Sequence, residues 1–374
     1  MTKWSLAVPP SRRAPRPRST GPGQRPYGVR ESAAPAGRAA PTTYDRPVRA
    51  RPARAHGKQG SPMARTPAPP VPATPAPAEP AHRLTGMTRH DVTVDGHRVS
   101  VHVAGNGPET VMLVPGIPDS SAVYRGQVPG LLRAGYRVIA PDLLGQGDSD
   151  LPATVAAYTV ARDERRLWAV ADALGADTFH LVGHDRGAAS TWSMAARRPD
   201  RVKSHVALSI GHPGAREAAG YEQKQLSWYM LRLLFPDAEE WLRGEAEGEG
   251  GPWSTFRWWV GDHPEADAWI SDLERPGAVT AMLAFYHANI HPVHGSMSPV
   301  PRVSVPVLGI WPTGDRYSGL EQLARSGEWV DGPWRFERLQ GAGHFLQLDR
   351  PDAVTRLILE HTEAYRHRTP APAT

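Results

Sequence analysis

Short runs of apolar residues recur along the chain from about residue 90 onward. Apolar and polar residues alternate through His90–Val94 and His97–Val103 on either side of Asp95-Gly96, a pattern that predicts a β-hairpin. The first three later runs are mainly apolar and predict buried strands, and the last three also predict strands. These runs are Thr110–Val114, Tyr136–Ala140, Thr178–Val182, Val202–Ile210, Val305–Trp311 and Trp334–Leu339.

The segments between the strands predict helices, because their apolar positions recur every three or four residues. The helix candidates are Ser121–Ala134, with a break near Pro129-Gly130, Thr159–Leu174, Ala188–Arg198 and Asp352–Glu360. Strands that alternate with helices predict an α/β fold with a mostly parallel, doubly wound sheet. Ligands of such sheets bind at the carboxyl ends of the strands, so we expect functional residues in the loops that follow them.

The strand pattern is interrupted between residues 213 and 300. This region holds 6 of the 12 tryptophans and has amphipathic runs around Gln225–Leu234 and Ala278–Ile290. We interpret residues 213–300 as a helical cap that is inserted into a core formed by residues 87–212 and 301–374.

The first 86 residues differ in composition from the rest. They hold 18 of the 39 prolines, and 15 Lys and Arg against 3 Asp and Glu, a net charge of +12. Such a segment cannot bury a core, so we predict a disordered Pro/Arg-rich extension over residues 1–86. Since the total is +5, the remainder carries a net charge of −7. The basic charge therefore belongs to the extension, and no nucleic acid is expected as a partner of the folded domain.

The chain has no cysteine, which excludes disulfides, a thiol nucleophile and a Cys-ligated metal. No apolar run approaches the roughly 18 residues of a membrane span, so no membrane partner is expected. Ser11-Arg12-Arg13 is not followed by the apolar segment of a secretion signal. These features predict a cytoplasmic protein with a small-molecule substrate, and nothing in the sequence implies a metal or cofactor.

The most informative stretch is Leu181–Ala188, in which Asp185 stands between Gly183 and Gly187. It joins a predicted strand to a predicted helix, and such a turn is typical of the nucleophile elbow of α/β hydrolases. The glycines are expected because a Cβ at either position would clash. The usual Ser needs a base, whereas a carboxylate, with a reference pKa near ~3.9, is already ionised. Asp185 therefore predicts attack on carbon and an enzyme ester; alternatively, it only caps the next helix.

The other catalytic candidates follow in the order nucleophile, acid, histidine. Asp315 directly follows a predicted strand, and His344 lies in a Gly-rich loop. With an Asp nucleophile, His344 would deprotonate the water that hydrolyses the ester, and Asp315 would orient its ring. The backbone N–H groups of Ile117 and Arg186 would stabilise the oxyanion. Either candidate side chain could instead be an ordinary loop residue.

Three motifs resemble the epoxide hydrolases of the α/β hydrolase fold and their dehalogenase relatives. They are Gly183-His184-Asp185-x-Gly187, Pro141-Asp142-Leu143-x-Gly145-x-Gly147-Asp148-Ser149 and Gly341-x-Gly343-His344, within a resemblance over about residues 88–365. The resemblance implies two cap tyrosines that donate hydrogen bonds to the epoxide oxygen, and Tyr229 and Tyr286 match their positions. A phenol suits this role because epoxide opening generates an alkoxide. Either tyrosine could instead only pack the cap.

Two positions depart from the family pattern. Pro115 stands where a histidine usually begins the loop after the third strand, which removes a side chain that braces the oxyanion loop. Arg186 stands where Trp usually follows the nucleophile, and this resembles haloacetate dehalogenases, in which the arginine binds the substrate carboxylate. We therefore expect its guanidinium to face the pocket, with pairing to a nearby acid as the alternative. Ala189 replaces those enzymes' second arginine and Ser209 their catalytic acid, which argues against a haloacid.

The sequence thus predicts an epoxide hydrolase with Asp185, His344, Asp315, Tyr229 and Tyr286 as catalytic residues and with Ile117 and Arg186 at the oxyanion or substrate. A hydrolytic haloacid or haloalkane dehalogenase is the alternative enzyme. A binding protein that has kept the fold is the alternative outside enzymes, because fold alone does not establish activity.

Overall fold

The computed structural model describes residues 84–244, 251–290 and 299–370. One eight-stranded sheet in the order β1-β2-β4-β3-β5-β6-β7-β8 forms its centre. The pairs β1–β2 and β2–β4 are antiparallel and the remaining neighbours are parallel, which confirms the predicted mostly parallel sheet. The strands are β1 (Thr88–Val94), β2 (His97–Ala104), β3 (Glu109–Val114), β4 (Tyr136–Pro141), β5 (Phe179–His184), β6 (Val202–Leu208), β7 (Val307–Pro312) and β8 (Trp334–Leu339).

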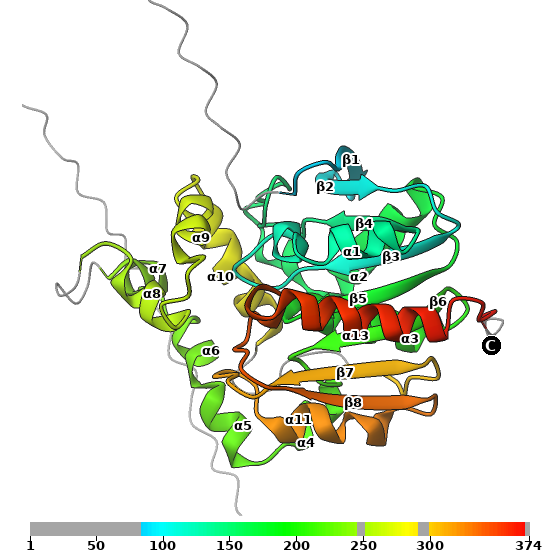
Figure 1. Cartoon of the computed structure of the whole chain (residues 1–374). Coiled ribbons are helices and arrows are strands. Elements are labelled where there is room, and N and C mark those ends of the chain that lie inside the picture. The colour runs from blue at the N-terminus through cyan, green and yellow to red at the C-terminus, as the bar shows by residue number, and fades with distance from the viewer. Residues whose placement is uncertain (1–83, 245–250, 291–298, 371–374) are drawn as a thin grey trace, which may run out of the picture. The chain divides into compact units, whose positions relative to one another are not determined.

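Helices cover both faces of the sheet, as a doubly wound fold requires (Figure 1). Leu113 and Val138 belong to the core cluster on one face, and Met112 and Ile139 to the cluster on the other. The first cluster includes residues of α1 (Val128–Arg133) and α13 (Pro351–Ala364), and the second includes residues of α2 (Val160–Ala173) and α3 (Arg186–Arg197).

The helix predicted over Ser121–Ala134 is two separate elements. A 3₁₀ helix, η1 (Ser121–Tyr124), precedes α1, and Pro129 lies in the first turn of α1. Proline is tolerated there because the first amides of a helix have no intrahelical acceptor. The prediction of a break near Pro129 was therefore wrong in its position, since this proline starts a helix.

Every element described between residues 213 and 290 is a helix, and α6 to α9 lie together at the left of Figure 1. The helices are α4 (Pro213–Ala218), α5 (Tyr221–Leu226), α6 (Trp228–Arg232), α7 (Ala238–Arg243), α8 (Ser254–Trp259), α9 (Ala266–Leu273) and α10 (Ala278–Asn289). The remaining short helices are η2 (Val155–Tyr158), α11 (Leu320–Ala324), η3 (Arg325–Trp329) and α12 (Leu346–Asp349).

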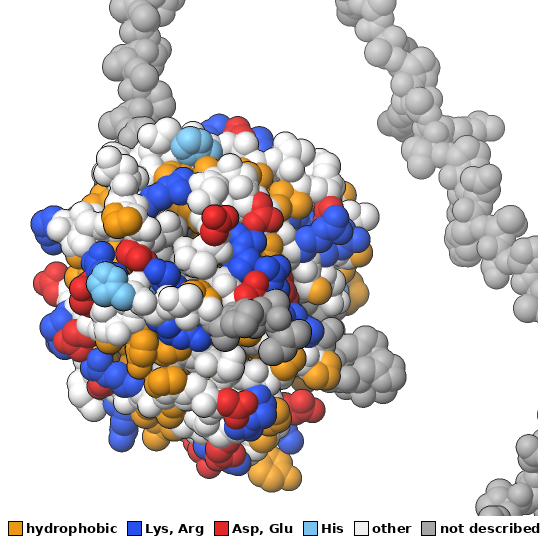
Figure 2. Space-filling model, turned by 90° about the vertical axis from the view of Figure 1, so that its right-hand side faces the viewer, with side chains coloured by type: hydrophobic (Ala, Val, Ile, Leu, Met, Phe, Trp, Pro, Cys, Tyr) orange, Lys and Arg blue, Asp and Glu red, His pale blue; other side chains and the backbone are white. Residues whose placement is uncertain are grey.

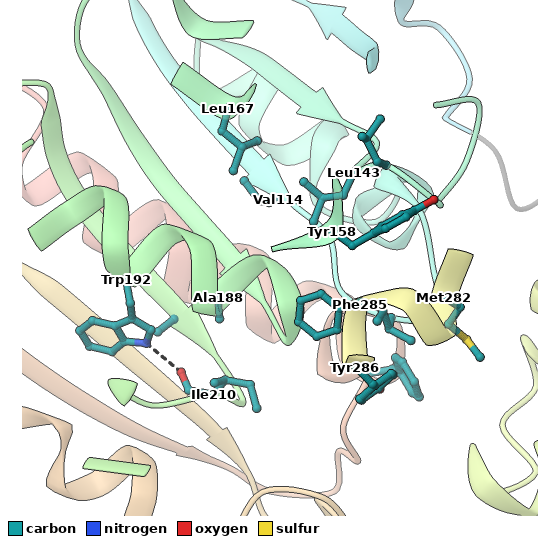
Figure 3. Packing of buried hydrophobic residues seen from close by; sticks show 14 of the residues in the cluster. Val114, Leu143, Tyr158, Leu167, Ala188, Trp192, Ile210, Met282, Phe285 and Tyr286 are labelled. Atoms are coloured by element: carbon teal, nitrogen blue, oxygen red, sulfur yellow. Dashed lines mark hydrogen bonds between the residues drawn. The ribbon is translucent and has the colours of Figure 1, made fainter. Parts of the chain in front are cut away.

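The last cap helix, α10, is tied to the core by Asn289. Its Oδ1 accepts from the Val160 N–H at 3.0 Å, and its Nδ2 donates to the Tyr158 carbonyl at 2.9 Å. Figure 3 shows Phe285 and Tyr286 beside one another on this helix, in the same apolar cluster as Tyr158 and Ala188. This anchoring fixes the position of Tyr286 relative to α3.

Of the predicted extension, only residues 84–86 are described. Leu84 is 9% exposed and packs in the core cluster, so the packed part of the chain begins before Met87. On the face drawn in Figure 2, positive and negative side chains are interspersed. None of the helices in the described ranges is both long and apolar enough to cross a membrane.

Candidate active site

Asp185 is the single residue between the end of β5 and the start of α3. Its backbone has φ 48° and ψ −117°, a region that residues with a Cβ rarely adopt. The flanking glycines permit the turn, because a Cβ at Gly183 would lie 2.1 Å from Thr191 Oγ1 and one at Gly187 would lie 2.3 Å from the Val114 carbonyl oxygen. The Asp185 side chain makes no capping hydrogen bond to α3. The alternative of a simple helix cap is therefore wrong.

The loop after β3 contacts the Asp185 carboxylate directly. The backbone N–H of Ile117 donates to Asp185 Oδ1 at 2.9 Å. Gln146 braces this loop, since its buried side-chain amide donates to the Gly116 carbonyl at 2.8 Å. The loop is thus held from the segment after β4, although Pro115 lacks the side chain expected to brace it.

His344 and Asp315 meet Asp185 at the carboxyl edge of the sheet. His344 Nδ1 lies 2.9 Å from Asp315 Oδ2, and its Nε2 lies 3.5 Å from Asp185 Oδ2. Asp315 Oδ1 accepts from the backbone N–H groups of Tyr317 and Ser318 at 2.8 and 3.0 Å. The loop after β7 therefore fixes the acid, the acid orients the imidazole, and the other ring nitrogen faces the elbow.

The two carboxylates control the charge of His344. Burial disfavours the imidazolium, but Asp315 and Asp185 outweigh it and raise the pKa of His344 to about 10. Burial likewise disfavours the Asp185 anion, yet its hydrogen bond and charge interaction with His344 hold the pKa of Asp185 well below its usual value. Burial lowers the pKa of the neighbouring His184 to about 4, so this ring is neutral. The resting site therefore contains two carboxylates and one imidazolium.

Tyr229 of α6 and Tyr286 of α10 close the cavity from the cap side. Both line it together with Asp185, and their ring centroids lie 6.3 Å apart in an edge-to-face arrangement. Burial and the negative charge of Asp185 raise the pKa of both phenols far above the usual value. Neither hydroxyl has a hydrogen-bond partner within the part of the chain that the structure describes. Both hydroxyls are thus protonated donors without an acceptor.

The cavity is also lined by two aromatic residues that were not predicted from the sequence, Trp259 and Tyr317. The Tyr317 hydroxyl donates to the Trp259 carbonyl, and its ring centroid lies 4.9 Å from that of His344. Tyr317 thus joins the loop of the acid to cap helix α8. Its place two residues after Asp315 was the available signal, whereas Trp259 was one of several cap tryptophans without a distinguishing pattern.

The expectation that the Arg186 guanidinium faces the pocket is wrong. The guanidinium is buried and donates to both carboxylate oxygens of Asp163, at 2.8 and 3.0 Å, and to the Leu144 carbonyl at 3.0 Å. It also lies 4.8 Å from the ring centroid of Phe285. Its planar fork suits a carboxylate, and α2 supplies one inside the protein. Among the described residues, no group of three or more His, Cys, Asp or Glu is arranged to hold a metal ion.

Comparisons with known proteins agree with this geometry. Residues 109–351 match the sequence profile of the alpha/beta hydrolase fold family. Epoxide hydrolase A of Mycobacterium tuberculosis (strain ATCC 25618 / H37Rv) is 29% identical over 315 residues, which cover 73% of this chain and 96% of that protein. An epoxide hydrolase of Caballeronia sordidicola is 34% identical over 196 residues, 51% of this chain, and the match spans only 58% of that protein.

A solved structure shows the same architecture. The crystal structure of epoxide hydrolase A from Mycobacterium thermoresistibile matches with a TM-score of 0.59 and 26% identity, over 74% of this chain and 98% of that one. These findings confirm the resemblance that the elbow and the two loop motifs indicated. The protein is a hydrolase that belongs to the α/β hydrolase fold family, among relatives named epoxide hydrolases.

Proposed function

We propose that this protein hydrolyses an epoxide to a vicinal diol through an ester of Asp185. One observation carries the proposal: a single cavity is lined by a carboxylate at the elbow and by two tyrosines whose hydroxyls lack acceptors among the described residues. An epoxide needs both parts, since a nucleophile must attack its carbon while a donor stabilises the oxygen that leaves. The names of the relatives support the same substrate class.

In the first step, Asp185 Oδ2 is the attacking oxygen. Oδ1 already accepts from the Ile117 N–H, whereas Oδ2 lies at 3.5 Å from His344 Nε2. Oδ2 forms a bond to one ring carbon, and the C–O bond of the epoxide breaks with its electron pair on oxygen. Tyr229 and Tyr286 donate to this oxygen as its charge develops.

In the second step, His344 acts as the base. Ester formation removes the negative charge of Asp185, one of the two charges that stabilise the imidazolium, so the pKa of His344 falls and its proton passes to the alkoxide formed in the first step. The neutral ring then takes a proton from water, and the hydroxide attacks the ester carbonyl carbon. The oxyanion forms on Oδ1, where the N–H groups of Ile117 and Arg186 stabilise it. Its collapse breaks the bond between Cγ and the substrate-bound oxygen, and this oxygen takes the proton of the regenerated carboxyl group as the diol leaves.

The test is to stop the enzyme between the two steps. His344→Gln should carry a mass increment equal to one substrate after mixing with styrene oxide, as measured by intact-protein mass spectrometry. The double variant Asp185→Asn/His344→Gln is the control and should carry none. An active wild type whose single variant never shows the increment would mean that water attacks the epoxide directly.

The same assay addresses the alternative enzyme. Chloroacetate should give neither an adduct nor free chloride, because Arg186 is committed to Asp163 and no longer supports a carboxylate site at the elbow. Chloride release by the wild type would instead establish dehalogenation.

A further inference from the structure

The backbone around the catalytic histidine is held from the ends of β6 and β7. After β7, the Gly314 N–H donates to the Ala342 carbonyl at 2.9 Å. After β6, the Ser209 hydroxyl donates to the His344 carbonyl at 3.1 Å. The peptide group that joins Ala342 to Gly343 is therefore held at its carbonyl end. Because glycine permits a wide range of backbone angles, the orientation of this peptide depends on its hydrogen bonds.

Asp349 of α12 holds the other end of this peptide group. Its Oδ2 accepts from the Gly343 N–H at 2.7 Å. Burial raises the pKa of Asp349, but its hydrogen bonds from His263 and from the Gly343 N–H outweigh burial and hold the pKa below its usual value. The acceptor is thus an ionised carboxylate, which binds an N–H more strongly than a neutral oxygen does. The direction of the peptide before His344 depends on this side chain.

The second oxygen of Asp349 faces the cap. Asp349 Oδ1 lies 3.2 Å from Nε2 of His263, which stands between α8 and α9. The other ring nitrogen, Nδ1, accepts from the Glu265 N–H at 3.1 Å, so Nε2 carries a proton in either charge state of the ring. The exposed fractions of the two side chains are 12% for His263 and 25% for Asp349. One carboxylate thus joins the histidine loop to the cap.

Aromatic packing keeps His263 in place. Its ring stacks on Trp269 of α9, with the centroids 4.9 Å apart, and it meets Phe345 edge-on at 5.2 Å. The ring centroids of Trp269 and Phe345 are themselves 4.4 Å apart. Phe345 directly follows His344, and Gly343 directly precedes it. The cap therefore contacts the chain after the catalytic histidine directly, and the chain before it through the carboxylate.

Resting on the proposed function, we infer that Asp349 is a positioning residue for the base and that His263 links it to the cap. Asp349 does not line the catalytic cavity, so it acts through the Gly343 peptide. Hydrolysis of the ester needs the His344 ring to reach a water, whereas attack by Asp185 needs no base. Loss of this contact should therefore slow the second step and spare the first.

The first experiment tests the acceptor. Single-turnover mixing with styrene oxide follows ester formation and ester hydrolysis as separate phases. Asp349→Ala should slow hydrolysis about tenfold, because the base is no longer held in place, and should leave ester formation within about twofold of the wild type. Asp349→Asn keeps an oxygen acceptor for Gly343 without the charge and should restore hydrolysis to within about threefold. Asp352→Ala removes an exposed carboxylate nearby and should change neither phase.

The second experiment tests the link to the cap. His263→Phe keeps an aromatic ring in the stack but removes the donor to Asp349, and it should slow hydrolysis about threefold to fivefold. His263→Gln can place its amide N–H near the same point and should stay within about twofold of the wild type. In Asp349→Ala, adding His263→Phe should have no further effect, because the two residues act in series. Glu265→Gln weakens a neighbouring contact between cap and core, the pair with Arg125, and should leave hydrolysis unchanged.

The readout separates positioning from stability, since loss of folded protein lowers the amplitude of both phases and not the rate of one. If the wild type forms the ester and the diol but Asp349→Ala hydrolyses the ester at the wild-type rate, the positioning role is wrong and the proposed function stands. If the wild type forms no diol, the proposed function itself fails and this inference falls with it. Should Asp349→Ala not fold, Asp349→Leu, which fills a similar volume without an acceptor, takes its place with the same expected and contradicting results. Hydrolysis at the wild-type rate in His263→Phe overturns the link to the cap.

Discussion

The core half and the cap half of the catalytic cavity are built in opposite ways. On the core side, each ionised group is already partnered: Asp185 contacts the Ile117 N–H and His344, and Asp315 accepts from two backbone N–H groups and contacts His344. On the cap side, the polar atoms are neutral donors without acceptors among the described residues. These donors are the hydroxyls of Tyr229 and Tyr286.

The difference assigns separate tasks to the two halves. Charges that are partnered before the substrate arrives need little reorganisation during the reaction, so the core fixes the nucleophile and the base. Donors without acceptors gain a partner only when a substrate oxygen enters, so the cap selects what reacts. The following changes should damage one half and spare the other.

The largest effect is expected from Asp315→Asn. The Asn oxygen can keep the two backbone hydrogen bonds, but the amide cannot stabilise an imidazolium and favours the wrong tautomer of His344. Turnover should fall by about 10⁴, as for loss of the acid in a hydrolase triad. Rapid-mixing measurements should show that the ester still forms and that its hydrolysis fails. Normal hydrolysis of the ester would show that Asp315 does not orient the base.

Arg186→Met should cause the next largest effect, on stability. It leaves the Asp163 carboxylate buried without its main partner, and breaking a buried pair costs about 3–5 kcal/mol. Asp163 also pairs with the buried Arg166 at 3.6 Å, so the triple variant Arg186→Met/Asp163→Leu/Arg166→Met, which removes the whole buried charge group, should recover most of this loss. Arg198→Met removes an exposed pair with Asp200 and should cost less than about 1 kcal/mol. Urea unfolding measures all three, and a single variant as stable as the wild type would contradict the account of Arg186.

Tyr229→Phe and Tyr286→Phe should each slow ester formation by about 10²–10³, comparable to the loss of one oxyanion donor. Hydrolysis of the ester should change much less, because the phenols act on the oxygen that leaves in the first step. Tyr221→Phe changes an exposed cap tyrosine and serves as the control. If both single variants and the double variant open epoxides at the wild-type rate, the epoxide assignment is lost.

The smallest effect concerns pH. The folded-state pKa of His344 is raised to about 10, above its unfolded value of about 6.5. The stability it contributes is therefore complete below pH 6.5 and is lost as the pH rises through 10. Raising the pH from about 7 to about 8 should cost about 1 kcal/mol. His344→Gln should lack this dependence in urea unfolding, and an equal slope in both proteins would contradict the resting imidazolium.

Much of this fold can be read from the sequence because parallel strands are buried on both faces. The segments of β3 and β7, Glu109–Val114 and Val307–Pro312, are predominantly apolar runs that carry a clear signal. The elbow can be predicted equally well, because its strained turn leaves no space for a Cβ at positions 183 and 187 and so requires Gly183 and Gly187. Local chemistry therefore predicted the strands and the turn.

Contacts between distant segments could not be predicted in this way. Arg186 and Asp163 stand 23 positions apart on different helices, and no local pattern indicates that they pair. The brace from Gln146 to Gly116 and the position of Trp259 depend likewise on how loops and cap helices pack. The sequence therefore predicted which residues form the site, but it did not predict what surrounds each of them.

The pair of Arg186 and Asp163 also restricts how this protein can change by descent. A lineage that replaces either residue alone passes through an intermediate in which a buried charge has lost its main partner. Such an intermediate is selected against unless the other position changes in the same period. The two positions should therefore vary together among descendants. Arg186 can persist without a role in substrate binding, because its replacement is tolerated only when Asp163 changes as well.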